Sequence, residues 1–250
     1  MQKIISIIIP VYNEEKNIPL INSKLEDIFL SLDYDYEIIF INDGSSDHSQ
    51  FVIWNLAKKN KKIKSIEFLK NFGKEAALTA GLQYATGEAA IIIDADLQHP
   101  VSLIPLFIEN WENGADVVIG LRTKNKGQSL LKIFFSFLFY KLVKIIGNKS
   151  IKSGVTDFRL IDRKVISKFN NLPKRNYMVR ARIDQLGFKS EYIKFEAGER
   201  ASGVASYSYF KLIKLAIFSL MPKSMSTGIF CKSLDKTLYV IKSTNNLRDF

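Results

Sequence analysis

Residues 89–100 read AAIIIDADLQHP, and this stretch determines the fold class that we expect. Its apolar run, Ala89–Ile93, ends directly in two acids spaced two residues apart. A short, uninterrupted apolar run bounded by polar residues is typical of a strand that is buried on both faces of a sheet. The runs Ile4–Val11 and Glu37–Ile41 also end in polar clusters, so we expect three similar strands.

Strand and helix signals alternate on both sides of this stretch, which is typical of βα units. The order predicts an α/β fold with a Rossmann-like, mostly parallel sheet and helices on both faces. The expected strands are Ile4–Val11, Glu37–Ile41, Ile63–Phe68, Ala89–Ile93, Asp116–Ile119, Phe158–Ile161 and Glu191–Phe195. The expected helices between them are Asn17–Leu32, Ser46–Lys59, Lys74–Ala85, Val101–Asn113 and Tyr177–Leu186.

The composition excludes several classes of protein. An apolar fraction of 47% and a charged fraction of 24% over 250 residues exclude a disordered chain. A single cysteine, Cys231, excludes an internal disulfide framework, and two histidines argue against a multi-histidine metal site. The 36 lysines and arginines against 25 acids give a net charge of +11, which indicates an anionic partner.

The positive charge is concentrated in two segments that are also apolar. No acid occurs between Arg122 and Lys152 or between Ala201 and Leu234. We expect amphipathic helices near 129–147 and 209–221 that lie at an anionic membrane surface, with core helices as the alternative. The basic residues alternate with aliphatic ones and match no zinc-finger, helix-turn-helix or RNP-like pattern, which argues against a nucleic-acid partner.

The sequence contains no signal for a membrane span or for secretion. No apolar run reaches the roughly 18 residues of a spanning helix, and the N-terminal run is too short for a signal peptide. We therefore expect a cytoplasmic protein, peripheral at the cytoplasmic face of the membrane. Its main domain is expected at residues 1–222, followed by a polar, loosely attached tail at 223–250.

The acids that follow the run at 89–93 suit a divalent cation. If the chain stays extended, Asp94, Asp96 and Gln98 point to one side and bring two carboxylates and an amide oxygen together. Such oxygen ligands suit Mg²⁺ or Mn²⁺, with phosphate oxygens and water completing the coordination shell. A solvated turn is the alternative explanation of this pattern.

Three further polar residues follow expected strands, at the end of the sheet where ligands of open α/β folds bind. Asp43 could accept hydrogen bonds from a nucleobase or ribose, or serve the turn in Asp-Gly-Ser-Ser. Glu14 could contact the same ligand or start a helix. Arg122 could bind a diphosphate or be a surface arginine. The dinucleotide motif GxGxxG and the P-loop motif GxxxxGK[ST] are absent from the sequence.

The ordered set of motifs resembles the family 2 nucleotide-sugar glycosyltransferases, which have the GT-A fold. The motifs are IPVYNE (9–14), NDGSSD (42–47), NFGKEAALTAGL (71–82), DADLQHP (94–100), TDFRLIDR (156–163) and ER..G...YS..KL (199–212). The resemblance extends over residues 4–222. It is greatest to the polyisoprenyl-phosphate glycosyltransferases, the group that includes dolichol-phosphate mannose synthase.

The resemblance implies roles for the matching residues. The nucleoside of the donor would be held by Pro10, Tyr12, Glu14, Ile41 and Asp43. The metal ion and diphosphate would be surrounded by Asp94, Ala95, Asp96 and Gln98, with Asp96 and Gln98 as direct metal ligands. The phosphates would be faced by Arg122 and Arg200.

Two departures from the family pattern affect these implied roles. Ser206 stands where relatives often have a lysine, so one cationic contact would be missing or come from elsewhere. The polar tail stands where many relatives continue into two membrane-spanning helices.

The implied reaction is transfer of a sugar, with inversion, from a UDP- or GDP-sugar to a polyprenyl or dolichyl phosphate. An ionised phosphate acceptor needs no general base, whereas a hydroxyl acceptor does. Asp157 is the candidate for that base or for positioning the acceptor, unless it is a structural partner of Arg159 or Arg163. Arg122 would stabilise the leaving diphosphate. The alternatives are a soluble transferase that adds sugar to a glycan or glycolipid hydroxyl, and a non-catalytic nucleotide-sugar-binding protein.

We expect salt-sensitive binding to anionic liposomes, because the lysines of 129–147 and 209–221 would meet anionic headgroups. Cosedimentation of the whole chain with anionic and neutral vesicles, at low and high salt, measures this binding. Absence of binding at low salt would favour the soluble transferase instead.

Overall fold

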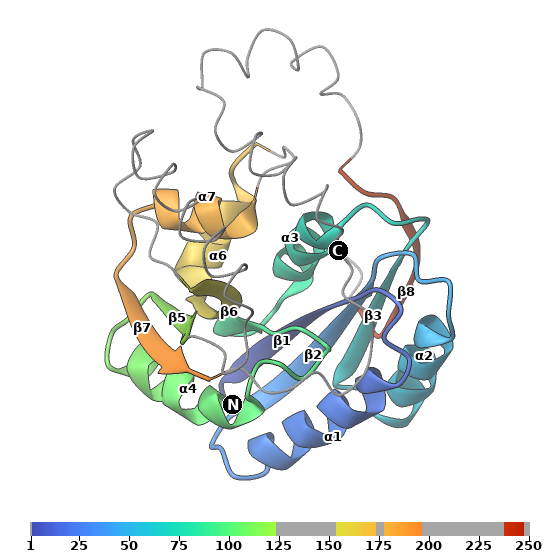
Figure 1. Cartoon of the computed structure of the whole chain (residues 1–250), viewed down its shortest axis with the longest axis horizontal. Coiled ribbons are helices and arrows are strands. Elements are labelled where there is room, and N and C mark those ends of the chain that lie inside the picture. Colours follow the sequence, from blue (N-terminus) through green and yellow to red (C-terminus); the bar gives the residue numbers. More distant parts are fainter. Residues whose placement is uncertain (1, 124–153, 174–177, 197–237, 248–250) are drawn as a thin grey trace, which may run out of the picture.

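An eight-stranded sheet with the order β7-β5-β6-β4-β1-β2-β3-β8 forms the centre of the fold (Figure 1). The computed structural model describes residues 2–123, 154–173, 178–196 and 238–247. The strands are β1 (Ile4–Val11), β2 (Asp35–Asn42), β3 (Ile63–Phe68), β4 (Ala89–Ile92), β5 (Val117–Arg122), β6 (Val155–Asp162), β7 (Ser190–Phe195) and β8 (Ile241–Asn245). The helices are α1 (Asn17–Phe29), α2 (Ser49–Lys59), α3 (Lys74–Tyr84), α4 (Ile104–Glu112), which follows a 3₁₀ turn at Val101–Leu103, α6 (Arg163–Asn170) and α7 (Val179–Gln185).

The sheet is mostly parallel, which confirms the α/β fold expected from the sequence. β1 pairs in parallel with β2 and β4, β2 with β3, and β5 with β7. β6 runs antiparallel between β4 and β5, and β8 runs antiparallel along β3. Because β1 to β4 point the same way, the loops that follow them gather at one end of the sheet.

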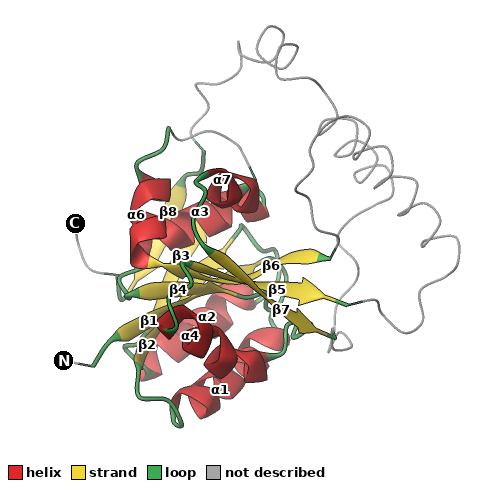
Figure 2. Ribbon diagram, turned by 90° about the vertical axis from the view of Figure 1, so that its left-hand side faces the viewer, coloured by secondary structure: helices red, strands yellow, loops and turns green. Residues whose placement is uncertain are grey.

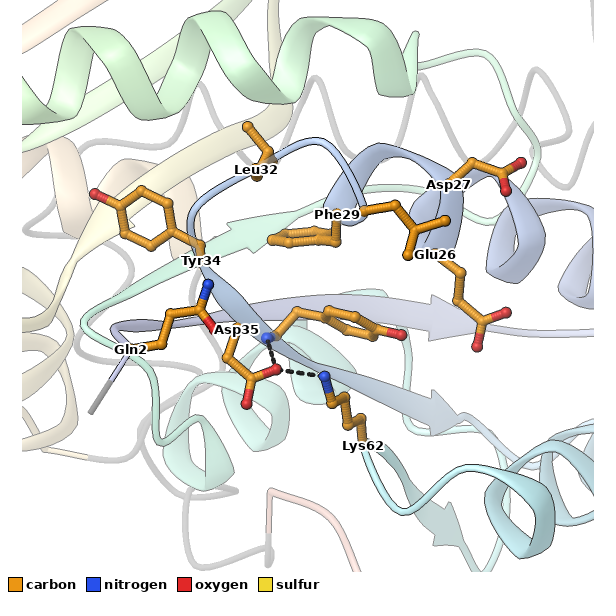
Figure 3. Close-up of a pocket in the computed structure, with 10 residues that line it drawn as sticks. Gln2, Glu26, Asp27, Phe29, Leu32, Tyr34, Asp35 and Lys62 are labelled. Carbon is orange, nitrogen blue, oxygen red and sulfur yellow. Dashed lines mark hydrogen bonds and ion pairs between the residues drawn. The ribbon is translucent and has the colours of Figure 1, made fainter.

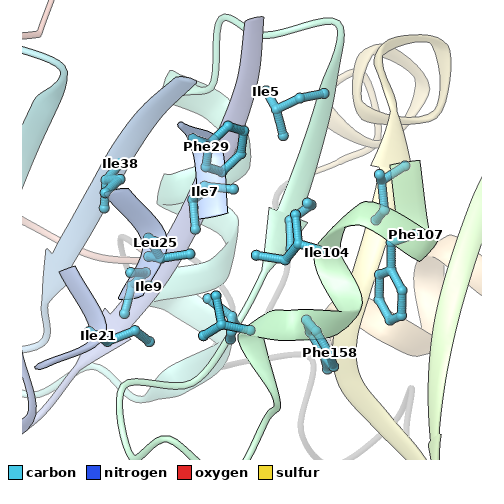
Figure 4. Close-up of a cluster of buried hydrophobic side chains, with 14 of the residues drawn as sticks. Ile5, Ile7, Ile9, Ile21, Leu25, Phe29, Ile38, Ile104, Phe107 and Phe158 are labelled. Carbon is cyan, nitrogen blue, oxygen red and sulfur yellow. The ribbon is translucent and has the colours of Figure 1, made fainter. Parts of the chain in front are cut away.

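Helices cover both faces of the sheet, with α1, α2 and α4 on one side and α3, α6 and α7 on the other (Figure 2). The side chains of β1 alternate between these two layers. Ile5, Ile7 and Ile9 pack with Leu25 of α1 in one cluster (Figure 4), whereas Ile8 belongs to the cluster on the α3 side. Each buried isoleucine contributes about 1.5–3 kcal/mol, so the core holds β1 firmly at the centre.

The expectation of a loosely attached tail is wrong for residues 238–247. β8 pairs with β3 through Ile66↔Thr244 and Ser65↔Asn245, and the ring of Tyr239 stacks on Phe68 at 4.9 Å. Lys242 Nζ also donates to Glu67 Oε1 at 2.6 Å. The polar composition of this segment suits an edge strand, because one side of such a strand faces water.

α6 is a helix that the sequence pattern did not indicate. Its N-cap is Asp162, whose side chain accepts a hydrogen bond from the backbone N–H of Lys164 at 2.8 Å. A helix of eight residues is too short to show a clear period, so the Asp cap was the available signal.

The two expected amphipathic helices, near 129–147 and 209–221, lie outside the described residues. The expected domain boundary at residue 222 lies outside them as well. Among the helices that the structure describes, none is long and apolar enough to cross a membrane.

A buried ion pair joins the amino ends of the central strands. Glu37 of β2 pairs with Lys64 of β3, and it accepts hydrogen bonds from Ser6 Oγ at 2.5 Å and from Thr86 N at 2.6 Å. Burial alone would raise the pKa of Glu37. The hydrogen bonds from Lys64, Ser6 and Thr86 outweigh burial, so this pKa lies below its ordinary value of 4.5.

Replacement of Glu37 by alanine should lower the free energy of unfolding by about 3–5 kcal/mol, because Lys64 would stay buried without its partner. Chemical denaturation measures this loss. The matched control is Asp35→Ala, which removes a half-exposed pair between the first residue of β2 and Lys62, the residue before β3, and should cost less than about 1 kcal/mol. Since the folded pKa of Glu37 is depressed, its contribution should be complete above pH 4.5 and decline as the pH falls through the folded value. Equal losses in both variants would contradict the assignment.

Candidate active site

The loops after β1 and β2 are fastened to each other by hydrogen bonds. Asn13 N donates to Ser45 Oγ at 3.0 Å, and the Asn13 side chain accepts from Ser46 N at 2.8 Å. Glu14 N donates to Ser49 Oγ at 2.9 Å. The two polar clusters that the sequence placed after separate strands therefore form one surface.

Gly44 allows this surface to approach the loop that leads into α3. Its φ is +66°, and a Cβ at this position would lie 2.4 Å from the backbone carbon of Lys70. A side chain there would collide with backbone, so the approach requires glycine.

Asp43 holds the start of α3 in place. Its Oδ1 accepts from Phe72 N at 2.6 Å and its Oδ2 from Gly73 N at 2.9 Å. The side chain is buried, and burial raises the pKa of Asp43 despite these two hydrogen bonds. Asp43 thus connects the end of β2 to α3, a role that neither expectation for this residue included. Its contact with a nucleoside stays a prediction.

Lys74, the first residue of α3, lies between two acids of the candidate site. Its Nζ is 2.6 Å from Asp94 Oδ1 and 2.9 Å from Asp157 Oδ2. Asp94 follows β4, and Asp157 belongs to β6, so a single cation joins three elements of the fold. Lys74 lies in the motif at residues 71–82, and the sequence pattern alone gives no sign of its contacts with these two distant acids.

The loop 94–98 does not stay extended, so the expectation that Asp94, Asp96 and Gln98 share one side by strand alternation is wrong. The chain turns after Asp94, and Leu97 has a φ of +62°. Asp96 Oδ1 accepts from Gln98 N at 3.1 Å across this turn. The side chain of Asp94 is directed instead to Lys74.

His99 supports the backbone of this loop. Asp94 N donates to His99 Nδ1 at 3.2 Å, and the His99 ring stacks on Phe158 at 5.0 Å. Burial lowers the pKa of His99, which agrees with an unprotonated Nδ1 that accepts a hydrogen bond. His99 Nδ1 lies 3.9 Å from Asp94 Oδ2, but an unprotonated imidazole carries no charge, so these two atoms do not form an ion pair.

The close partner of Asp157 is Lys74, and neither of the expected arginines, Arg159 and Arg163, pairs with it. Arg159 contacts Asp184 at 3.4 Å, and Arg163 Nε donates to the carbonyl oxygen of Gly87 at 2.7 Å. Burial would raise the pKa of Asp157, but the charge and hydrogen bond of Lys74, together with the charges of Arg180 and Arg159, outweigh burial and hold this pKa below its ordinary value.

The remaining predicted residues lie around this centre in different environments. Tyr12 is exposed and Pro10 partly exposed, whereas the side chains of Ile41 and Ala95 are buried in the core. Ile41 and Ala95 could therefore offer a ligand only backbone atoms. Arg122 is the partly exposed last residue of β5, and its N–H donates to the carbonyl oxygen of Gly154 at 2.8 Å. Arg200 lies outside the described residues.

A cavity of about 540 Å³ lies at the opposite end of the sheet, near the start of β2 (Figure 3). Tyr34, Asp35 and Tyr36 line it, together with Lys62, which pairs with Asp35 at 2.6 Å. Ligands of open α/β sheets bind at the carboxyl ends of the strands, so this cavity is separate from the candidate active site.

Solved structures share this fold. A glucosyl-3-phosphoglycerate synthase from Mycobacterium tuberculosis, in complex with Mn²⁺, UDP-glucose and phosphoglyceric acid, matches 97% of this chain and 89% of its own, with a TM-score of 0.61 and 17% identity. The mannosyltransferase PcManGT from Pyrobaculum calidifontis, in complex with GDP-Man and Mn²⁺, matches 85% of this chain and 60% of its own, with a TM-score of 0.53 and 20% identity. These likenesses confirm the GT-A fold.

Sequence comparison identifies the family. The model of Glycosyl transferase family 2 matches residues 6–169. The bactoprenol glucosyl transferase of Shigella phage SfX is 37% identical over 237 residues, which cover 92% of this chain and 78% of that protein. The prophage bactoprenol glucosyl transferase homolog of Escherichia coli (strain K12) is 38% identical over 230 residues, which cover 90% of this chain and 75% of that protein. The chain belongs to glycosyl transferase family 2 and is a glycosyltransferase with the GT-A fold.

Proposed function

We propose that the chain transfers a sugar, with inversion at the anomeric carbon, from a UDP- or GDP-sugar to a polyprenyl phosphate at a membrane surface. The observation that carries this proposal is the 37% identity to a bactoprenol glucosyl transferase over 92% of the chain. The basic, apolar segments near 129–147 and 209–221 support a peripheral position at the cytoplasmic face of the membrane.

The donor nucleoside is proposed to lie on the joined loops after β1 and β2. Tyr12 is exposed there, and Asp43 holds the adjoining start of α3 through two backbone amides. Structural neighbours bound to GDP-Man and UDP-glucose support a nucleotide-sugar donor. Arg122, at the end of β5, is proposed to stabilise the negative charge of the leaving diphosphate.

The state of Asp157 supports an acceptor that is already ionised. Its carboxylate is held at 2.9 Å from Lys74, and its lowered pKa makes it a weak proton acceptor. A hydroxyl acceptor requires a general base, ideally one whose pKa lies near the working pH. A phosphate monoester carries its own nucleophilic oxygen anion, so the site needs no base for it.

The residues of the loop 94–98 fit a divalent cation that is shared with the donor. Mg²⁺ is usually held by one or two carboxylates together with substrate phosphates and water. Among the described residues no three His, Cys, Asp or Glu side chains group around a cation position. Asp96 and Gln98 are therefore proposed to hold Mg²⁺ or Mn²⁺ jointly with the diphosphate, while Asp94 pairs with Lys74. A bound cation would neutralise charge on the leaving group.

Turnover of a panel of UDP- and GDP-sugars, with and without polyprenyl phosphate, tests the proposal. We expect product only when polyprenyl phosphate and Mg²⁺ or Mn²⁺ are present, and NMR should show an inverted anomeric centre. Asp96→Ala should lose metal-dependent transfer, whereas Asp27→Ala, at an exposed acid of α1, should not. Transfer to a glycan hydroxyl without polyprenyl phosphate would contradict the acceptor. Full activity of Asp96→Ala would contradict the metal assignment.

Lys74→Met should lower kcat by about 10- to 100-fold, a range typical for the loss of a group that orients ligands of a metal site. The reason is that Asp94 and Asp157 both lose the cation that fixes them. Steady-state kinetics measures this effect, and thermal unfolding checks that the variant folds. Lys70→Met is the matched control, because Lys70 is an exposed lysine on the loop that leads into α3. A folded Lys74→Met enzyme with the kcat of the control would refute this role.

A further inference from the structure

Arg180 is a charged residue beside the candidate active site to which the sequence motifs assign no role. It follows Val179, whose backbone N–H donates to Glu75 Oε2 at 2.6 Å. Glu75 is the neighbour of Lys74 at the start of α3. The first residues of α7 therefore lie directly against the first residues of α3, next to Lys74 and its two acids.

A second contact determines which face of α7 meets the site. Asp184, four residues after Arg180, contacts the buried Arg159 of β6 at 3.4 Å. Residues four apart lie on the same helix face, so Arg180 is on the side of α7 that meets β6. Arg159 and Asp157 are two apart and lie on the same side of β6. This geometry places Arg180 next to Asp157.

The electrostatics agree with this placement. Burial would raise the pKa of Asp157, and the charge of Lys74, followed by that of Arg180, lowers it. Arg180 is partly exposed, and within the described part of the chain it forms no hydrogen bond or ion pair. Lys74, by contrast, is engaged by Asp94 and Asp157.

An anionic acceptor needs a cation at this position. A phosphate that approaches the transferred sugar would meet the negative charges of Asp94, Asp96 and Asp157, which repel it. Lys74 is already shared by two of these acids, and Arg122 is proposed for the donor diphosphate. A guanidinium can bind two phosphate oxygens at once, which gives both attraction and orientation.

We propose that Arg180 binds the phosphate of the acceptor, a phosphate monoester carried by a lipid. This inference rests on the proposed function, because it concerns the second substrate of the same site. Arg182 provides the matched control. It lies two residues further along α7, hence on another face of the helix, and its Nη1 donates to the carbonyl oxygen of Pro173 at 2.8 Å.

Binding measurements test the proposal independently of turnover. Farnesyl phosphate is titrated into the whole chain by calorimetry, with farnesol and inorganic phosphate as separate probes. Arg180→Gln should weaken the binding of farnesyl phosphate by about tenfold or more, as expected for the loss of a charge-assisted contact, and Arg182→Gln should not. Equal weakening in both variants, no weakening in Arg180→Gln, or no binding to the wild-type chain would overturn the proposal. If inorganic phosphate also binds, and Arg180→Gln weakens its binding by the same factor, the result would support a phosphate subsite at Arg180. The lipid chain would then contribute little to the affinity.

Steady-state kinetics distinguishes ligand binding from a purely structural role. Arg180→Gln should raise the KM for polyprenyl phosphate by about tenfold and leave the KM for the donor and the thermal unfolding temperature unchanged. Equal increases in both KM values would indicate a structural role and overturn the proposal. A wild-type chain that binds farnesyl phosphate through Arg180 but transfers no sugar to it would refute the proposed function and leave this inference standing.

Discussion

The parallel pairing of β1 with β2 and β4 is the constraint on which the rest of the structure depends. β1 is buried between two helical layers, so its direction and register are determined by isoleucines on both faces. Parallel neighbours end at the same edge, and this edge receives the polar loops of all three strands. The site therefore follows from the way the core packs, although none of its charged residues contributes to that core.

Lys74 connects separate elements at the candidate site, as β1 connects its two neighbouring strands in the sheet. Asp43 fastens the turn before it, and Lys74 then joins Asp94 of the loop 94–98 to Asp157 of β6. One helix start thus connects the proposed nucleoside, metal and acceptor regions. Electrostatic preorganisation of this kind lowers a barrier because the charges need little rearrangement during the reaction.

The sequence allowed most of the sheet to be predicted, because buried parallel strands are apolar runs and the turns after them are polar. Contacts between distant residues could not be predicted in the same way. Asp43 meets backbone amides 29 and 30 residues away, and no local pattern encodes such a distance. The prediction that Asp94–Gln98 stays extended was wrong, because the chain turns at Leu97, where φ is positive. β8 was missed because a solvent-facing edge strand is polar and carries no apolar run.

β8 also determines where the chain can be divided. The match to the family model ends at residue 169, but β7 and β8 come later and cover the two outer strands, β5 and β3. A fragment that stops at residue 169 would contain much of the candidate site, but its edge strands would be β5 and β3, which are mostly buried in the described sheet, in place of the more exposed β7 and β8. Open edges of this kind promote association between molecules through their backbones. Residues 238–247 lie far in sequence from the candidate active site. A shortened chain should nevertheless keep them, because they cover β3 and so limit association between molecules.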